Sequence, residues 1–142
     1  MIILDTNVIS ELTREQPYTG VLVWLDGCDP DELSTTSITV AELLYGVELL
    51  PEGRRKASLL DALVEILEEG FEDRVEPFDV AAARIYARLA ADRRRAGRPI
   101  DVPDAQIAAI CRSVGATLAT RNVDDFVDLG IDVVNPWETP AP

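Results

Sequence analysis

Short apolar runs alternate along the chain with longer segments in which apolar residues recur at helical spacing. The apolar runs predict strands at residues 2–4, 33–36, 75–78, 117–119 and 133–134. Periodicity and capping residues predict helices at 8–12, 21–25, 39–50, 54–69, 80–95 and 103–114. Pro77 favours an edge position for the third strand, and Gly115 is expected to close the last helix. This alternation predicts an α/β fold with a mostly parallel sheet of about five short strands covered by helices on both faces.

The length of the chain suits one domain over residues 1–142. At 142 residues, roughly two-thirds of the surface of the unfolded chain is buried on folding, and 47% of the residues are apolar. The charge is strongly acidic, with 26 acidic and 13 basic residues and a net charge of −13. Such a field repels nucleic acid, so any contact with nucleic acid needs a local basic patch or metal ions.

Several kinds of site are excluded by what the sequence lacks. There is no histidine, which rules out Ser-His-Asp and Cys-His catalysis, HNH nucleases and zinc held by histidine. Cys28 and Cys111 are too few for a four-cysteine zinc site and are expected to be buried thiols in a reducing compartment. The first residues have no basic stretch, and no apolar run approaches the roughly 20 residues of a membrane span. We therefore expect a cytoplasmic protein that works through carboxylates, hydroxyls and metal ions.

Four acidic residues are candidates for one site. Asp5 follows the first strand, Asp125 comes after the fourth, and Glu42 and Asp104 begin helices. The working residues of parallel sheets lie beyond the carboxyl ends of the strands, where these side chains could meet. Clustered carboxylates repel one another and persist only if some are protonated or a cation neutralises them. Oxygen ligands select Mg²⁺ or Mn²⁺, which suit in-line hydrolysis of a phosphodiester.

Helix capping is the alternative interpretation of most of these acids. Three pairs have the spacing of a capping box: Thr39 and Glu42, Asp101 and Asp104, Asn122 and Asp125. An acid in the first turn is favoured by the helix dipole without any catalytic role. Asp5 has no evident capping partner beyond its own turn. The two interpretations are compatible, because a carboxylate held at a helix N-terminus can still bind a metal ion.

The order of four motifs resembles one known family. The segments are Met1–Ser10, Thr39–Gly46, Pro103–Ala109, and Leu118–Phe126 followed by Val134–Trp137. Together they are similar to the motifs of PIN-domain nucleases, in particular VapC/FitB-type toxins. Each motif alone is weak, but the four in this order are specific and span essentially the whole chain. The resemblance implies a PIN-like α/β/α sandwich.

The resemblance also implies an activity and a set of site residues. Members of this kind are Mg²⁺-dependent ribonucleases, with Mn²⁺ as a possible substitute, and act as toxins of VapBC toxin–antitoxin pairs. By resemblance, Asp5 and Asp104 are metal ligands and Glu42 completes the acidic set. Asn122 stands where many members carry Asp, so it would offer a neutral oxygen, and Asp125 would supply the fourth charge. A further set is expected to orient carboxylates or water, or alternatively to serve only turns and caps: Thr6, Asn7 and Thr120.

Two surfaces are candidates for binding substrate and partners. Arg94 and Arg95 belong to the densest basic run and are expected to hold RNA phosphates, although a solvated helix C-terminus would also favour them. Apolar residues on helices 39–50 and 54–69 are expected either to pack in the core or to form a groove for an antitoxin helix beside a homodimer interface. The acidic chain suits a basic partner.

Three other functions are conceivable for an acidic α/β domain. Asn122 motivates a catalytically degenerate PIN-like module that binds a partner protein. A phosphoacceptor receiver domain needs a lysine near its acids, but the only lysine, Lys56, lies in a predicted helix. A haloacid-dehalogenase-type phosphatase has Asp-x-Asp after its first strand, whereas Asp5 is followed by Thr6 and Asn7. The sequence therefore favours the nuclease.

Overall fold

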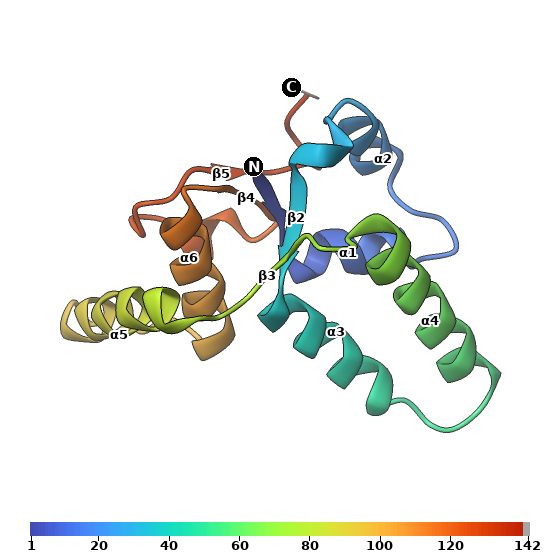
Figure 1. Ribbon diagram of the computed structural model, residues 1–142, viewed down its shortest axis with the longest axis horizontal. Coiled ribbons are helices and arrows are strands. Elements are labelled where there is room, and N and C mark those ends of the chain that lie inside the picture. The colour runs from blue at the N-terminus through green and yellow to red at the C-terminus, as the bar shows by residue number, and fades with distance from the viewer. Residues whose placement is uncertain (141–142) are drawn as a thin grey trace.

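The computed structural model describes residues 1–140 and contains a five-stranded sheet (Figure 1). Its strands are β1 (Ile2–Leu4), β2 (Leu33–Thr36), β3 (Val75–Glu76), β4 (Thr117–Ala119) and β5 (Val133–Val134). They run in the order β3-β2-β1-β4-β5, and every neighbouring pair is parallel. All the predicted strands are present. β3 is at an edge and ends before Pro77, because proline has no N–H to donate to a neighbouring strand.

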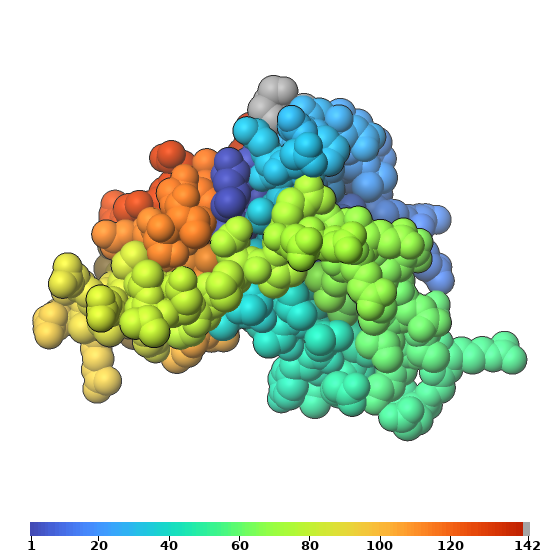
Figure 2. Space-filling model, viewed as in Figure 1, coloured from blue at the N-terminus to red at the C-terminus, as the bar shows by residue number. Residues whose placement is uncertain are grey.

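Helices cover both faces of the sheet, as the sequence predicted. They are α1 (Thr6–Leu12), α2 (Thr19–Asp26), α3 (Ser37–Glu48), α4 (Arg54–Glu65), α5 (Val80–Arg95) and α6 (Val102–Val114). In Figure 1, α5 and α6 lie on one side of the sheet and α1 to α4 on the other. In the space-filling view of Figure 2, the outer end of α5 (yellow) and the beginning of α4 (green) form opposite ends of the molecule. The molecule is therefore an α/β/α sandwich built on a parallel sheet.

Alternate side chains of the strands pack into two separate hydrophobic cores, one on each face of the sheet. Ile3 and Leu118 pack with α5 and α6, whereas Leu4 and Ala119 pack with the helices on the other side. Successive side chains of a strand point to opposite faces, so a sheet that is buried on both faces needs apolar residues at every position. This explains why the run Ile2–Leu4 is continuously apolar rather than alternating.

Several helix ends differ from the prediction for local reasons. α3 begins at Ser37, because the Thr36 hydroxyl caps it by accepting a hydrogen bond of 3.0 Å from the backbone N–H of Thr39. The predicted helix 54–69 is α4 followed by a π-helical turn, Ile66–Gly70. α6 ends as predicted, with Gly115 in the left-handed conformation at a φ of 67°. Short 3₁₀ turns span Pro30–Glu32 and Val123–Phe126.

The two thiols are buried and unpaired, as predicted. Burial raises the pKa of Cys28 and raises that of Cys111 to about 12. The thiol form therefore predominates at neutral pH, which makes both side chains poor nucleophiles. Among residues 1–140, no helix is long and apolar enough to cross a membrane.

Candidate active site

Asp5 is a buried carboxylate held at the carboxyl end of β1. It caps α1 by accepting a hydrogen bond of 2.8 Å from the N–H of Thr6, and it is only 4% exposed. Its other oxygen accepts hydrogen bonds from the Thr120 hydroxyl, at 2.7 Å, and from the Asn7 amide, at 3.2 Å. Burial raises the pKa of Asp5, although these hydrogen bonds oppose the shift. The carboxylate is thus fixed in one orientation at the carboxyl ends of the neighbouring strands β1 and β4.

The side chain of Glu42, which belongs to α3, is positioned by a residue of α1. The Thr6 hydroxyl donates a hydrogen bond of 2.8 Å to Oε1 of Glu42. Because Thr36 caps α3, Glu42 lies in the second turn and cannot close a capping box with Thr39. The capping interpretation of Glu42 is therefore wrong, and the side chain is turned toward the segment that follows β1.

The electrostatic interactions of the predicted acids converge on Asp104. It lies in the first turn of α6, and its pKa is raised to about 6. Burial is the largest cause, followed by the negative charges of Asp5, Asp125, Glu42 and Asp101. Asp125 also raises the pKa of Asp5. Acids from the end of β1, from α3 and from the turn after β4 therefore lie close enough to Asp104 for their charges to act on it.

Asn7 ties the loop after β4 to the start of α1. Its side-chain oxygen accepts a hydrogen bond of 3.0 Å from the N–H of Arg121, and its amide donates one of 3.0 Å to the Thr120 hydroxyl. That hydroxyl also accepts a hydrogen bond of 3.0 Å from the N–H of Asn122. Asn122 is exposed, and its side chain forms no capping bond to the described turn that follows. Its amide is therefore available to a ligand.

The donor set fits a hard divalent cation with open coordination positions. All the converging acidic side chains offer oxygen atoms, and the part of the raised pKa of Asp104 that comes from neighbouring negative charges would be offset by a cation. Within residues 1–140, no group of three or more acidic or cysteine side chains is placed so that it could hold a metal ion. Mg²⁺ is ordinarily bound by one or two carboxylates, with water and substrate phosphate completing its shell. The arrangement therefore fits a catalytic site better than a closed structural one.

Arg94 and Arg95 are not part of this cluster. Both are exposed in the last turn of α5, where Arg95 forms a 3.3 Å ion pair with Asp92. Figure 1 shows that the C-terminal end of α5 points away from the sheet and from α3. Both side chains are therefore separate from the acidic residues around Asp104.

Thr36 and Thr39 are site residues that the sequence prediction missed. Both are fully buried, and their hydroxyls hydrogen-bond to each other at 3.2 Å. The Thr6 hydroxyl reaches Oγ1 of Thr39 at 3.4 Å as well as Glu42. The available signal for Thr36 is its position at the carboxyl end of the predicted strand, whereas Thr39 was recognisable only as a capping candidate.

A family model for the PIN domain matches residues 2–131. The chain belongs to the PIN-domain family. Three relatives match nearly the whole chain, and the names of two of them, VapC and FitB, confirm the resemblance to VapC/FitB-type proteins. They are plasmid stability protein StbB of Pseudomonas syringae pv. tomato, 45% identical over 97% of this chain and 99% of the relative, VapC ribonuclease Y4jK of Sinorhizobium fredii, 41% identical over 97% and 99%, and toxin FitB of Neisseria gonorrhoeae, 40% identical over 96% and 99%.

Solved structures agree with this assignment. The crystal structure of FitAcB from Neisseria gonorrhoeae matches with a TM-score of 0.90 and 40% identity, covering 98% of this PIN-domain chain and 100% of that chain. VapBC-5 of Mycobacterium tuberculosis, from the VapBC family of toxin–antitoxin systems, matches with a TM-score of 0.67 and 28% identity, covering 94% and 96%. The predicted sandwich is therefore confirmed as a PIN fold.

Proposed function

We propose that residues 1–142 act as one PIN domain, a Mg²⁺-dependent ribonuclease that is the toxin of a cytoplasmic VapBC-type pair. The observation that carries this proposal is the pKa of Asp104, which Asp5, Asp125 and Glu42 help to raise to about 6. Carboxylates whose negative charges disfavour one another in this way are stabilised by a proton or by a bound cation. A relative 41% identical to this chain carries the name VapC ribonuclease, which supports RNA as the substrate.

The surroundings of each carboxylate indicate its role in the proposed reaction. Asp5 and Asp104 would hold the cation, since Asp5 is fixed by three hydrogen bonds and Asp104 is the acid on which the other charges act. When bound, Mg²⁺, or Mn²⁺ in its place, activates a water molecule and offsets negative charge on the phosphate. Glu42, aligned by Thr6, and Asp125 assist with the metal or with the water.

Neutral polar groups orient the charged ones. Thr120 and Asn7 hold Asp5 by hydrogen bonds, and the exposed amide of Asn122 would help to orient the substrate or water. Losing such supporting hydrogen bonds commonly costs about 10- to 100-fold in metal affinity or activity. The replacement of aspartate by Asn122 leaves the acidic set intact, because Asp125 still acts on both Asp5 and Asp104. This supports a nuclease over a degenerate binding module.

Arg94 and Arg95 would contact RNA at a distance from the cleaved bond. Both are exposed at the outer end of α5, so they are free to meet the backbone of a bulky, structured RNA. Because the chain has a net charge of −13, positively charged side chains are needed to offset its long-range repulsion of RNA.

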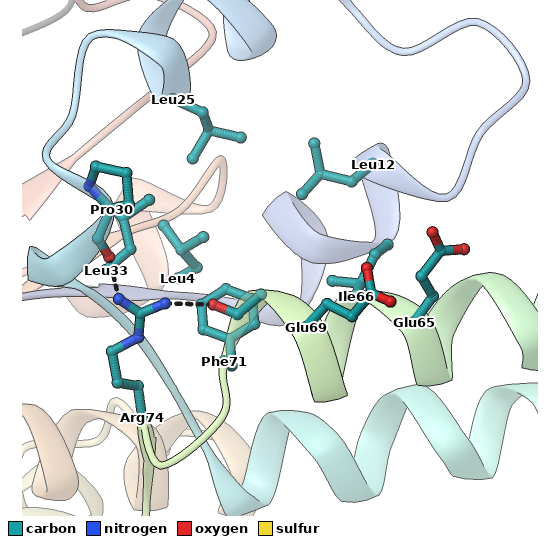
Figure 3. A pocket seen from close by; sticks show the side chains of 11 residues that line it. Leu4, Leu12, Leu25, Pro30, Leu33, Glu65, Ile66, Glu69, Phe71 and Arg74 are labelled. Atoms are coloured by element: carbon teal, nitrogen blue, oxygen red, sulfur yellow. Dashed lines mark hydrogen bonds between the residues drawn. The ribbon is translucent and has the colours of Figure 1, made fainter.

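The antitoxin would dock in an apolar pocket on the α1–α4 side of the sheet. The groove predicted on α3 and α4 is largely filled, since Leu43, Val47 and Leu63 are buried in the core. A pocket of about 450 Å³ instead opens between β1, α1, α2 and the turn after α4. Figure 3 shows leucines from these elements converging on it, with Glu65 and Glu69 on the side of the α4 turn. Apolar walls beside acidic residues suit an amphipathic, basic segment.

A homodimer would form through the exposed end of α3. Tyr45 and Leu49 are each 67% exposed there, although both are large and apolar. Such side chains commonly mark protein interfaces when they are grouped. The substitution Tyr45→Glu is then expected to shift a dimer to monomer in sedimentation analysis.

Incubation of purified protein with structured RNAs tests the proposed activity. We expect cleavage in Mg²⁺ or Mn²⁺, none in EDTA, and a loss of at least about 100-fold in Asp104→Asn, while antitoxin binding persists. Absence of metal-dependent cleavage by the wild-type protein, freed of its partner, would contradict the proposal and favour the binding module.

A further inference from the structure

A polar pocket of about 470 Å³ is built from the segments that follow three strands of the sheet. Glu11, Arg14 and Tyr18 come from the region after β1, Arg121 follows β4, and Trp137 and Glu138 follow β5. Because these strands are parallel, the three segments leave the sheet at the edge where Asp5 lies. The pocket therefore belongs to the same working edge as the carboxylates.

One side chain connects this pocket to the carboxylates. The N–H of Arg121 donates a hydrogen bond of 3.0 Å to Asn7, whose amide donates one of 3.2 Å to Asp5. Two hydrogen bonds thus connect the backbone of Arg121 to the carboxylate of Asp5.

The guanidinium of Arg121 lies over the ring of Trp137 in the pocket, and we call this pair the Arg121–Trp137 platform. The guanidinium carbon lies 5.3 Å from the centre of the Trp137 ring, and that ring packs against the second core. Arg121 is exposed, and within residues 1–140 it forms no salt bridge. Nucleobases stack on guanidinium planes as well as on aromatic rings. Tyr18, 52% exposed, adds a second aromatic surface to the same pocket.

A buried carboxylate fixes another wall of the pocket. Glu11 is 6% exposed, accepts a hydrogen bond of 2.8 Å from the N–H of Tyr18, and pairs with Arg14 at 3.3 Å. Glu138 is the other acid in the lining. Its charge would repel a phosphate, but a carboxylate accepts hydrogen bonds from the amino groups of bases. The lining therefore suits a base better than a phosphate.

We propose that this pocket binds one unpaired nucleotide of the substrate, with its base stacked on the Arg121–Trp137 platform. This inference rests on the proposed ribonuclease function and adds a site for substrate recognition. Arg14 also lines a neighbouring cleft of about 1020 Å³ together with Arg54 and Arg55, which gives the RNA backbone a cationic path away from the pocket. Since a stacked base must be free of its own helix, the substrate is single-stranded at this position.

Tryptophan fluorescence provides a direct test, because the chain has only two tryptophans and Trp24 is buried. The probe is a single-stranded RNA oligonucleotide, titrated in EDTA into the cleavage-deficient Asp104→Asn protein. We expect quenching on binding. Adding Arg121→Gln should weaken binding by roughly 5- to 150-fold, the range that corresponds to the loss of one stacked base. Adding Trp137→Phe, which keeps an aromatic ring, should abolish the quenching but change affinity only a few-fold.

Arg112→Gln is the matched control, since it removes one positive charge from the last turn of α6, at the opposite end of that helix from Asp104. It should leave affinity unchanged, and all variants should have the melting temperature of their parent protein. Unchanged affinity in Arg121→Gln, or quenching that survives in Trp137→Phe, would overturn the proposal. So would loss of antitoxin binding in Arg121→Gln with RNA binding intact, which would assign the pocket to a protein partner. Because these titrations need neither metal nor cleavage, their failure is distinct from failure of the proposed activity.

Discussion

At the scale of one residue, the ionised carboxylate of Asp104 lowers the free energy of unfolding of the metal-free protein. Its pKa rises from 3.8 to about 6 because burial and neighbouring carboxylates disfavour its charged form. Above that pH the ionised group is less favourable in the folded chain than in the unfolded one. Asp5 is shifted in the same direction. The metal-free protein is therefore less stable at neutral pH than its packing alone would make it.

Replacement of this carboxylate should stabilise the metal-free protein. In EDTA at pH 7.5, Asp104→Asn removes the charge that the site disfavours. Its free energy of unfolding should exceed that of the wild type by on the order of 1 kcal/mol, after allowance for solvent screening. Thermal melts followed by circular dichroism measure this difference.

The pH dependence gives the control for this prediction. A raised pKa means that the folded state keeps its proton longer, so the destabilisation appears as pH rises from about 4 to about 6 and is absent below the unfolded value. The difference between variant and wild type should therefore vanish near pH 3.5. Mg²⁺ at pH 7.5 should raise the melting temperature of the wild type more than that of the variant. A variant less stable than the wild type at pH 7.5 in EDTA would contradict this account.

Thr6 is a positioning residue whose removal should affect activity more than folding. Thr6→Val keeps the shape of the side chain but loses the hydroxyl that donates to Glu42. We expect kcat for RNA cleavage to fall about 10-fold or more, with a melting temperature close to that of the wild type. Ser113→Ala, which removes a hydroxyl that bonds only to Ile110 near the other end of α6, should cleave at the wild-type rate. Equal rates in both variants would show that Glu42 needs no alignment.

At the scale of elements, the sequence predicts the end of a helix or strand where a single residue type decides it. Gly115 is recognisable because a helix that ends in the left-handed conformation favours glycine, and Pro77 because proline limits a strand. The predicted start of α3 is wrong because the two threonines at 35–36 are also good strand residues, so their pattern cannot show which hydroxyl turns back to cap the helix. The position of the Glu42 side chain was not predictable either, because it depends on a hydrogen bond between residues 36 positions apart.

Two glycines should respond in opposite directions to the same substitution. Gly115→Ala forces a Cβ into a left-handed conformation and should destabilise the protein by about 1 kcal/mol, although no atom lies within 4 Å of the added carbon. Gly46→Ala, in the interior of α3 and equally uncrowded, should stabilise it by roughly 0.5–1 kcal/mol. Urea unfolding at constant m-value measures both. Changes of the same sign in the free energy of unfolding would contradict the view that backbone conformation decides the effect of alanine at these two positions.

At the scale of the whole molecule, the topology explains why four distant acids could be expected to meet. The order β3-β2-β1-β4-β5 places β1 beside β4, so Asp5 and Thr120 leave the sheet side by side. Parallel strands between helices were predictable from the alternating pattern, and ligand sites lie at the carboxyl ends of such strands. The Arg121–Trp137 platform was not predictable, because it joins two loops whose meeting depends on the packing of the C-terminal segment.

The net charge of −13 gives the basic end of α5 a measurable role in binding. Reversal of charge in the double variant Arg94→Glu/Arg95→Glu should weaken RNA affinity in EDTA and flatten its dependence on salt concentration. Each phosphate that these side chains no longer neutralise should lower the slope of log affinity against log salt by about 0.7 for single strands. Filter-binding titrations at several salt concentrations measure this slope, with Arg112→Gln as the single-charge control. An unchanged slope would exclude this end of α5 from the RNA interface.

Crystals soaked in Mn²⁺ test most directly whether Asp5 and Asp104 share a cation, through anomalous scattering from the ion. We expect an anomalous peak within coordination distance of carboxylate oxygens of both side chains, and its loss in Asp104→Asn. A protein that binds Mn²⁺ only away from these two side chains, or that keeps the peak in the variant, would contradict the proposed metal site.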